Sequence, residues 1–158
     1  MFSFVACSPN VSEDSRAEQV ITEYVNTYYT ITKDDIELYK KIVHGNKDIN
    51  ILISDSNKAN EKFKKSMTDK AYESIITDRM TYGRCKEASD GQYTVIVSSI
   101  KLEKNSEDEQ TKIYYYDVEL IQTSISGNES KSIKDKKQIT VSKIENSWKV
   151  SNSYTYGY

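Results

Sequence analysis

The chain of 158 residues is poor in several residue types, and each shortage excludes a class of function. It has a single histidine and two cysteines, Cys7 and Cys85. These three side chains cannot complete a structural zinc site, and no carboxylate stands out as a further ligand. No stretch approaches the roughly 20 apolar residues of a membrane-spanning helix. The sequence therefore predicts no metal, no cofactor and no transmembrane segment.

Neither sign of charge dominates the chain. Lysine and arginine total 22 against 24 aspartate and glutamate, and the formal net charge is -2. Proteins that bind nucleic acid through its phosphates usually carry a basic face, which this chain lacks. We therefore predict that nucleic acid is not a partner.

Glycine and proline are also scarce, at five and one residues, whereas tyrosine occurs 13 times. Together with abundant lysine, isoleucine and asparagine, this bias is typical of AT-rich coding sequences and indicates a low-GC bacterium. Bulky tyrosine and isoleucine supply the core that disordered chains lack. The length suits one ordinary domain.

The first residues carry a local signal. Phe4-Val5-Ala6-Cys7 resembles the lipobox of bacterial lipoproteins, although leucine is commonest at the position of Phe4 and no basic segment precedes it. The resemblance implies lipidation at Cys7, with residues 1–12 as signal remnant and tether and residues 13–158 as the domain. If Cys7 is acylated, Cys85 is a small buried strand residue. If it is not, Cys7 is an incidental buried thiol or forms a disulfide with Cys85.

Apolar residues recur at helical spacing in the first half of the chain. One stripe runs from Val20 to Tyr28, and a capping box at Thr32–Asp35 begins a second helix that ends near Gly45. The alternation in Asp48–Ser54 fits either a brief strand or the entry to a helix. Phe63 to Arg79 is predicted to be helical, with a break where Thr68 caps the final helix.

The second half alternates apolar and polar residues, which predicts strands. The expected strands are Arg84–Ala88, Gln92–Lys104, Lys112–Gln122, Gln138–Ile144 and Trp148–Tyr156. Asp90-Gly91 is predicted to be a hairpin turn, and Ser124–Lys137 a wide solvated turn.

Alternation also assigns faces to these strands. Tyr114, Tyr116, Val118 and Leu120 are predicted to face the core, and Asp117 lies on the opposite, solvated face with Glu119. In the last strand the residues expected to share one side are Trp148, Val150, Asn152, Tyr154 and Tyr156.

Helices followed by an antiparallel run indicate an α+β fold. The layout resembles the nuclear transport factor 2-like superfamily, through the segments 20–29, 34–43 and 67–72 and the hairpin 139–150. That resemblance implies N-terminal helices on a strongly curved antiparallel sheet of four to five strands, a cone or cystatin-like shape. It is greatest for small secreted or lipid-anchored members from low-GC Gram-positive bacteria. The fold alone assigns no chemistry.

Aromatic residues from several elements could converge on a cavity for a small amphipathic ligand. The candidate pocket residues are Tyr24, Tyr28, Tyr114, Tyr116, Trp148 and Tyr154. The alternative is that tyrosine replaces phenylalanine as ordinary core material. His44 ends the second predicted helix, where a cation complements the helix dipole.

We therefore expect a non-catalytic, extracytoplasmic binding or interaction module, anchored in the membrane by lipid on Cys7, whose partner is a protein or a small amphipathic ligand. One alternative is a structural subunit of an envelope or conjugation assembly, which predicts self-association or an apolar patch on the outer face of the sheet. Another is an isomerase, dehydratase or hydrolase, which requires an inward-pointing acid or histidine beside a tyrosine hydroxyl.

Overall fold

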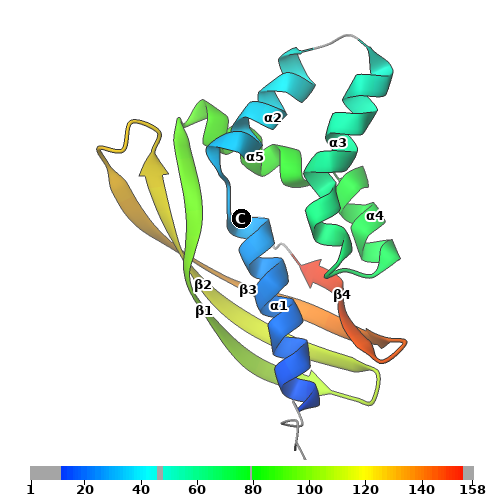
Figure 1. Cartoon of the computed structure of the whole chain (residues 1–158). Helices are drawn as coiled ribbons and strands as arrows, with labels where there is room; N and C mark the ends of the chain where they lie inside the picture. The colour runs from blue at the N-terminus through cyan, green and yellow to red at the C-terminus, as the bar shows by residue number, and fades with distance from the viewer. Residues whose placement is uncertain (1–11, 46–47, 79, 155–158) are drawn as a thin grey trace, which may run out of the picture.

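The computed structural model describes residues 12–45, 48–78 and 80–154 (Figure 1). Five helices precede four strands in this part of the chain. The helices are α1 (Glu13–Tyr29), α2 (Lys33–His44), α3 (Ile49–Lys64), α4 (Asp69–Thr77) and α5 (Met80–Asp90). The strands are β1 (Tyr93–Glu107), β2 (Thr111–Ser124), β3 (Ser130–Ile144) and β4 (Ser147–Tyr154).

The four strands form one antiparallel meander in the order β1-β2-β3-β4. The sheet is long and curved, and α1 lies along its concave face, while α2 to α5 gather at one end (Figure 1). N-terminal helices packed on a curved antiparallel sheet of four strands make an α+β fold, which confirms the predicted fold class.

Side-chain caps set where the helices begin. Ser12 accepts a hydrogen bond from the backbone of Ser15, and Thr68 caps α4 by accepting from Ala71. At α2 the capping box is complete, because Thr32 accepts from the Asp35 amide while the Asp35 carboxylate accepts from the Thr32 amide. The predicted boundaries at Thr32 and Thr68 are therefore confirmed.

The core lies between α1 and the concave face of the sheet. Tyr114, Tyr116, Val118 and Leu120 are buried as predicted, whereas Asp117 is exposed and pairs with Lys136 at 3.6 Å on the outer face. α1 contributes Ala17, Ile21, Tyr24, Val25, Tyr28 and Tyr29 to this core.

Bulges change the phase of the alternation in two strands. In β1 a bulge at Ser98 changes which residues face inward: before it they are odd-numbered, such as Val95, and after it they are even-numbered, such as Ile100. In β4 a bulge at Ser151 makes Asn152 exposed and pairs Ser153 with buried Ile139. The prediction that Asn152 shares the side of Trp148 is therefore wrong, because it assumed an unbroken period of two. The side chain of Tyr154 and all of Tyr156 lie outside the described residues.

The segment predicted as the strand Arg84–Ala88 belongs instead to α5. Its buried residues, Cys85, Ala88 and Ser89, follow helical spacing at i, i+3 and i+4. Asp90 ends this helix, and the Gly91 amide donates to the Glu87 carbonyl at 2.9 Å, so Asp90-Gly91 is a helix end and not a hairpin turn. Cys85 is buried and forms no disulfide with a described residue, but it lies on a helix and not on a strand; Cys7 is outside the described residues.

The structure also settles two other predicted segments. For one it selects between two alternatives, and for the other it differs from the prediction. Asp48 caps α3, so the segment Asp48–Ser54 is helical. The wide turn predicted for Ser124–Lys137 is wrong, because β3 already begins at Ser130 and pairs with β2 from there. The polar residues of this stretch are compatible with a strand because one face of it meets solvent and the other lines an open hollow.

Charged contacts hold the N-terminus of α1 against the end of the sheet where β1 turns into β2 and β3 turns into β4. Glu13 accepts a hydrogen bond from the Trp148 indole at 2.9 Å and pairs with Lys143 at 2.9 Å. Asp14 pairs with Lys112, which is only 6% exposed. The Lys143 and Trp148 donors lower the pKa of Glu13, and the Lys112 ammonium lowers that of Asp14.

These contacts predict a loss of stability in acid. A carboxyl whose pKa is lower in the folded chain stabilises it above the unfolded pKa, and that contribution disappears as pH falls through the folded pKa. For Asp14 the ordinary value is 3.8, so the loss begins near that pH. We expect the free energy of unfolding, measured with urea at about pH 6 and about pH 3, to fall less for Asp14→Asn than for the unmodified chain.

The matched control for this measurement is Glu109→Gln. Glu109 is an exposed acid in the β1–β2 turn and makes no ion pair with the described residues. It should reproduce the pH dependence of the unmodified chain. An identical acid response in all three proteins would contradict the role assigned to Asp14.

Candidate functional site

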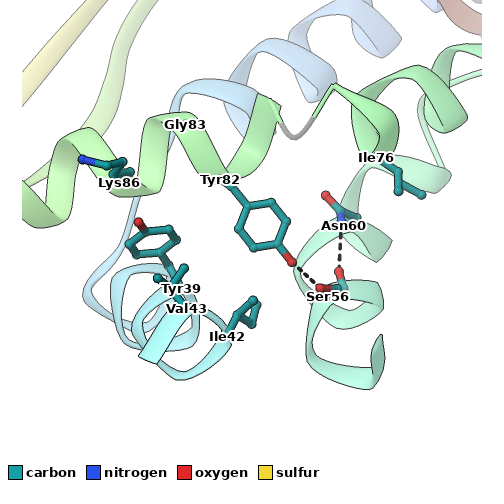
Figure 2. Close-up of a pocket in the computed structure, with 9 residues that line it drawn as sticks. All are labelled: Tyr39, Ile42, Val43, Ser56, Asn60, Ile76, Tyr82, Gly83 and Lys86. Carbon is teal, nitrogen blue, oxygen red and sulfur yellow. Dashed lines mark hydrogen bonds between the residues drawn. The ribbon is translucent and has the colours of Figure 1, made fainter. Parts of the chain in front are cut away.

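Among the hollows on the described part of the molecule, two have volumes of about 470 Å³ and 510 Å³. The first, which we call the helical groove, lies between α2, α3, α4 and α5 (Figure 2). Its lining residues are Tyr39, Ile42, Val43, Ser56, Asn60, Ile76, Tyr82, Gly83 and Lys86.

Three polar residues of the helical groove, Tyr82, Ser56 and Asn60, are hydrogen-bonded to one another, whereas Lys86 pairs with Asp90. The Tyr82 hydroxyl meets the Ser56 hydroxyl, and the Asn60 amide donates to the Ser56 carbonyl at 2.9 Å (Figure 2). The apolar walls remain open, since Val43 is 48% exposed and Ile76 is 39% exposed. An occupant of this groove would be held by burial of apolar surface, with few directional hydrogen bonds.

The second hollow, the cone mouth, has a volume of about 510 Å³. It lies where α1 ends, between α5 and the inner face of β1, β2 and β3. Its lining residues are Tyr28, Tyr29, Met80, Gly83, Arg84, Glu87, Tyr93, Val95, Leu120, Gln122, Ile133, Lys134, Asp135 and Lys137.

Arg84 of α5 enters the cone mouth across two tyrosine rings of α1. Its Cζ atom lies 4.8 Å from the ring centre of Tyr28 and 4.5 Å from that of Tyr29. Nη2 donates to the Tyr29 carbonyl at 3.2 Å, whereas the buried Nε has no acceptor among the described residues. Stacking on two electron-rich faces orients the guanidinium and leaves part of its donor capacity unused.

Beside this stack, a carboxylate and an ammonium of β3 complete the polar end of the mouth. The Tyr29 hydroxyl donates to Asp135 Oδ2 at 2.6 Å, and the Lys137 ammonium lies 3.1 Å from the same oxygen. The Tyr116 hydroxyl is 3.4 Å from that of Tyr29. Burial, followed by the neighbouring Tyr116 and Asp135, raises the pKa of Tyr29 far above its ordinary value. Tyr29 therefore keeps its proton and acts as the donor to Asp135.

The predicted pocket residues are placed mostly in the packed core. Tyr24, Tyr114 and Tyr116 are buried between α1 and the sheet, and of the predicted residues whose side chains are described only Tyr28 lines the cone mouth. The Tyr24 and Tyr28 rings stack with centres 5.9 Å apart. The hydroxyls of Tyr24 and Tyr114 have no partner among the described residues, and burial raises the pKa of Tyr24 to about 12.

Other residues singled out from the sequence lie away from the mouth. Trp148 is buried at the opposite end of the sheet, with Lys112 5.2 Å from its ring centre. His44 is exposed and is the last residue of α2, where its position agrees with a helix-end role. Cys7 and the side chain of Tyr154 lie outside the described residues.

Sequence reasoning missed three of the charged residues that line the mouth, Arg84, Asp135 and Lys137. Arg84 was assigned to a strand, and Asp135 and Lys137 to a solvated turn. A usable signal existed in β3, because Ile133, Asp135 and Lys137 continue the period of two that leads to the buried Ile139. No comparable signal identified Arg84.

Among the described residues, no group of three or more histidine, cysteine, aspartate or glutamate side chains is arranged to hold a metal ion. None of the described helices combines the length and the apolar character needed to cross a bilayer.

Comparison with known proteins adds information on the fold alone. No protein-family model matches the chain, and no curated protein sequence does. The structure resembles TraH from the Gram-positive conjugative plasmid pIP501, with 12% identity and a TM-score of 0.51 over 93% of this chain and 96% of TraH.

Two further solved structures are more distantly similar. The intermembrane space region of the chloroplast protein ARC6 has 12% identity and a TM-score of 0.46, over 92% of this chain and 97% of that one. A nuclear transport factor 2-like superfamily protein from Salmonella enterica has 10% identity and a TM-score of 0.40, over 77% and 94%.

The polar end of the mouth predicts a stability difference between two acids of the same sheet. Asp135→Ala removes the acceptor of Tyr29 and the counter-charge of Lys137, so we expect the free energy of unfolding to fall by about 1–3 kcal/mol. Asp117→Ala removes an acid from the outer face and should change it by no more than about 0.5 kcal/mol. Urea unfolding measures both values. Equal losses would show that the Asp135 contacts contribute nothing specific.

Proposed function

We propose that this protein is a non-catalytic binding module that holds a ligand in the cone mouth. The observation that carries the proposal is a hollow of about 510 Å³ in which polar side chains converge at one end and apolar strand surface is left uncovered at the other. Ile133 is on the inner side of β3, paired with Leu120, yet remains 37% exposed. Concave sites with apolar walls and a few convergent polar groups are typical of ligand binding.

The geometry of Asp135 gives a specific reason to keep a catalytic alternative. This carboxylate points inward and lies beside the Tyr29 hydroxyl, which is the arrangement that an isomerase or dehydratase would need. However, the Tyr29 proton is already donated to Asp135, and Lys137 pairs with the same oxygen. Both groups are satisfied by each other, which supports a positioning role over proton transfer to a ligand.

We further propose an extracytoplasmic location, with the domain anchored by lipid on Cys7 in a low-GC Gram-positive bacterium. The lipobox-like Phe4–Cys7 segment supports this anchor, and the first helix starts only six residues after Cys7, at Glu13. A structural subunit of a conjugation assembly is a further candidate. TraH derives from a Gram-positive conjugative plasmid, and the exposed Val43 and Ile76 of the helical groove offer apolar contact surface on the helices, not on the outer sheet face.

Binding at the cone mouth is tested by nitrogen-15 NMR of the full chain with a set of neutral, cationic and anionic small amphiphiles. We expect at least one to shift the amide signals of the residues around Arg84, Ile133 and Asp135 while those of the helical groove stay unchanged. The amphiphile should be recovered intact, without exchange of its carbon-bound hydrogens in deuterated water.

Two results would contradict this proposal. Shifts confined to the helical groove, or none with any amphiphile, would remove the cone mouth as the binding site. Deuterium incorporation that disappears in Asp135→Asn would instead establish the catalytic alternative, because the carboxylate would then be moving a proton.

The anchor is tested by expressing the full upstream reading frame in a Gram-positive host and measuring the intact mass of the membrane-fraction protein. We expect acyl chains on Cys7, and release of Cys7→Ser into the soluble fraction, because two or more acyl chains hold a protein on a bilayer. Cys85→Ser is the matched control and should stay in the membrane fraction. An unmodified mass for the unmodified chain would overturn the anchor.

A further inference from the structure

The register of the sheet divides the cone mouth into two chemically distinct ends. Lys137, Asp135 and Ile133 alternate on the inner side of β3, opposite Tyr116, Val118 and Leu120 of β2. At about 3.3 Å per residue, Lys137 and Ile133 are roughly 13 Å apart along the strand. A ligand that follows β3 would meet charge at one end and hydrocarbon at the other.

The charged end holds a cation that has no counter-ion among the described residues. Arg84 and Lys137 line the mouth together with two acids, Asp135 and Glu87, while Lys134 alternates to the outer face opposite Glu119. Asp135 is bonded to Tyr29 and paired with Lys137, whereas Arg84 makes no ion pair with any described residue.

The guanidinium of Arg84 is fixed by its stack on Tyr28 and Tyr29, and among the described residues it donates only one hydrogen bond, from Nη2 to the Tyr29 carbonyl. A fixed guanidinium with free donors matches the planar oxygens of a carboxylate or phosphate. The Lys137 ammonium lies 5.8 Å and 5.6 Å from the centres of the same two rings, so both cations contact one pair of tyrosines.

The other end is apolar and only partly covered. Val95 and Leu120 form its floor and are buried, while Ile133 beside them is exposed on the inner side of the sheet. Tyr93 and Met80 are half-buried at its edges. Covering this strip with a hydrocarbon tail would remove apolar surface from water at a favourable free energy.

From these observations we propose that the cone mouth binds an amphipathic anion. Its carboxylate or phosphate head contacts Arg84 and Lys137, and its hydrocarbon tail lies over Leu120 and Ile133. This assignment rests on the binding function proposed above and adds the chemical class of the ligand. The mouth volume of about 510 Å³ lies within the range of roughly 300–1,000 Å³ that small-ligand sites occupy.

Isothermal titration calorimetry of the full chain with three probes of one tail length tests the head group. The probes are decanoate, decyl phosphate and decyltrimethylammonium, each kept monomeric. We expect both anions to bind at least about tenfold more tightly than the cation, as charge-assisted contacts usually provide. The tighter of the two anions distinguishes a fatty-acid-like carboxylate from a lipid-like phosphate as the natural head.

Neighbouring residues of β3 provide matched variants. Lys137 points into the mouth, whereas Lys136 points outward and pairs with Asp117. We expect Lys137→Gln to weaken binding of the preferred anion by about tenfold and Lys136→Gln to leave it unchanged. Arg84→Gln should weaken it similarly, with the exposed Arg16→Gln as its control. The circular dichroism of each variant establishes that it is folded.

Each outcome separates the ligand class from the binding function. Equal affinity for the cationic probe, or equal losses in Lys136→Gln and Lys137→Gln, would overturn the anionic head while leaving a binding mouth. No binding of any of the three probes, together with an amphiphile that binds at the mouth in the NMR experiment, would overturn the ligand class alone. No binding in either experiment would overturn both proposals.

Discussion

The packing of α1 against the concave face of the sheet is the contact on which the rest of the structure depends. Ile21 and Val25 of α1 and Ile139 and Val141 of β3 are completely inaccessible to solvent, so the two halves of the chain share one core. Burial of this size is the main free-energy gain that offsets the entropy of ordering a long sheet. The position of α1 also determines where the mouth opens, because the helix ends at Tyr29 and the strands continue beyond it. The cone mouth is therefore the part of the concave face that α1 does not reach.

The sequence predicted those parts of the fold whose signals are local. The reciprocal cap of Thr32 and Asp35 and the cap at Thr68 depend on residues within one turn, and the alternation of β2 continues without interruption. The predictions were wrong where contacts between distant segments determine the secondary structure or the phase of a strand. Arg84–Ala88 is too short for its period to distinguish strand from helix, and the bulge at Ser151 depends on the neighbouring strand. The early part of β3 was missed because its inner face borders an open hollow, so two of its inward residues, Asp135 and Lys137, are charged.

The candidate site was less predictable than the fold. Tyr28 was expected in a pocket from its chemistry, but the tyrosines expected beside it fill the core, because a long apolar body with one hydroxyl serves either purpose. Arg84, Asp135 and Tyr29 come from a late helix, a strand and an early helix, and only their convergence gives them a role. The spacing of residues in the sequence does not predict which side chains of three distant segments come into contact. By contrast, the inward position of Asp135 could have been inferred once β3 was extended by the period of Ile139.

The direction of α1 relates the two ends of the molecule. Its 17 residues span about 25 Å, from Glu13, which contacts Trp148 and Lys143 at the β3–β4 hairpin, to Tyr29 at the mouth. If acyl chains on Cys7 hold the N-terminal side close to a bilayer, this helix acts as a strut that lifts the opening away from the lipid surface. A ligand would then reach the cone mouth from the side that faces away from the membrane. It would either have left the membrane beforehand or never have been in it. In this orientation the cone mouth would face away from the membrane, and the Asp14–Lys112 ion pair at the other end of the domain would face the membrane.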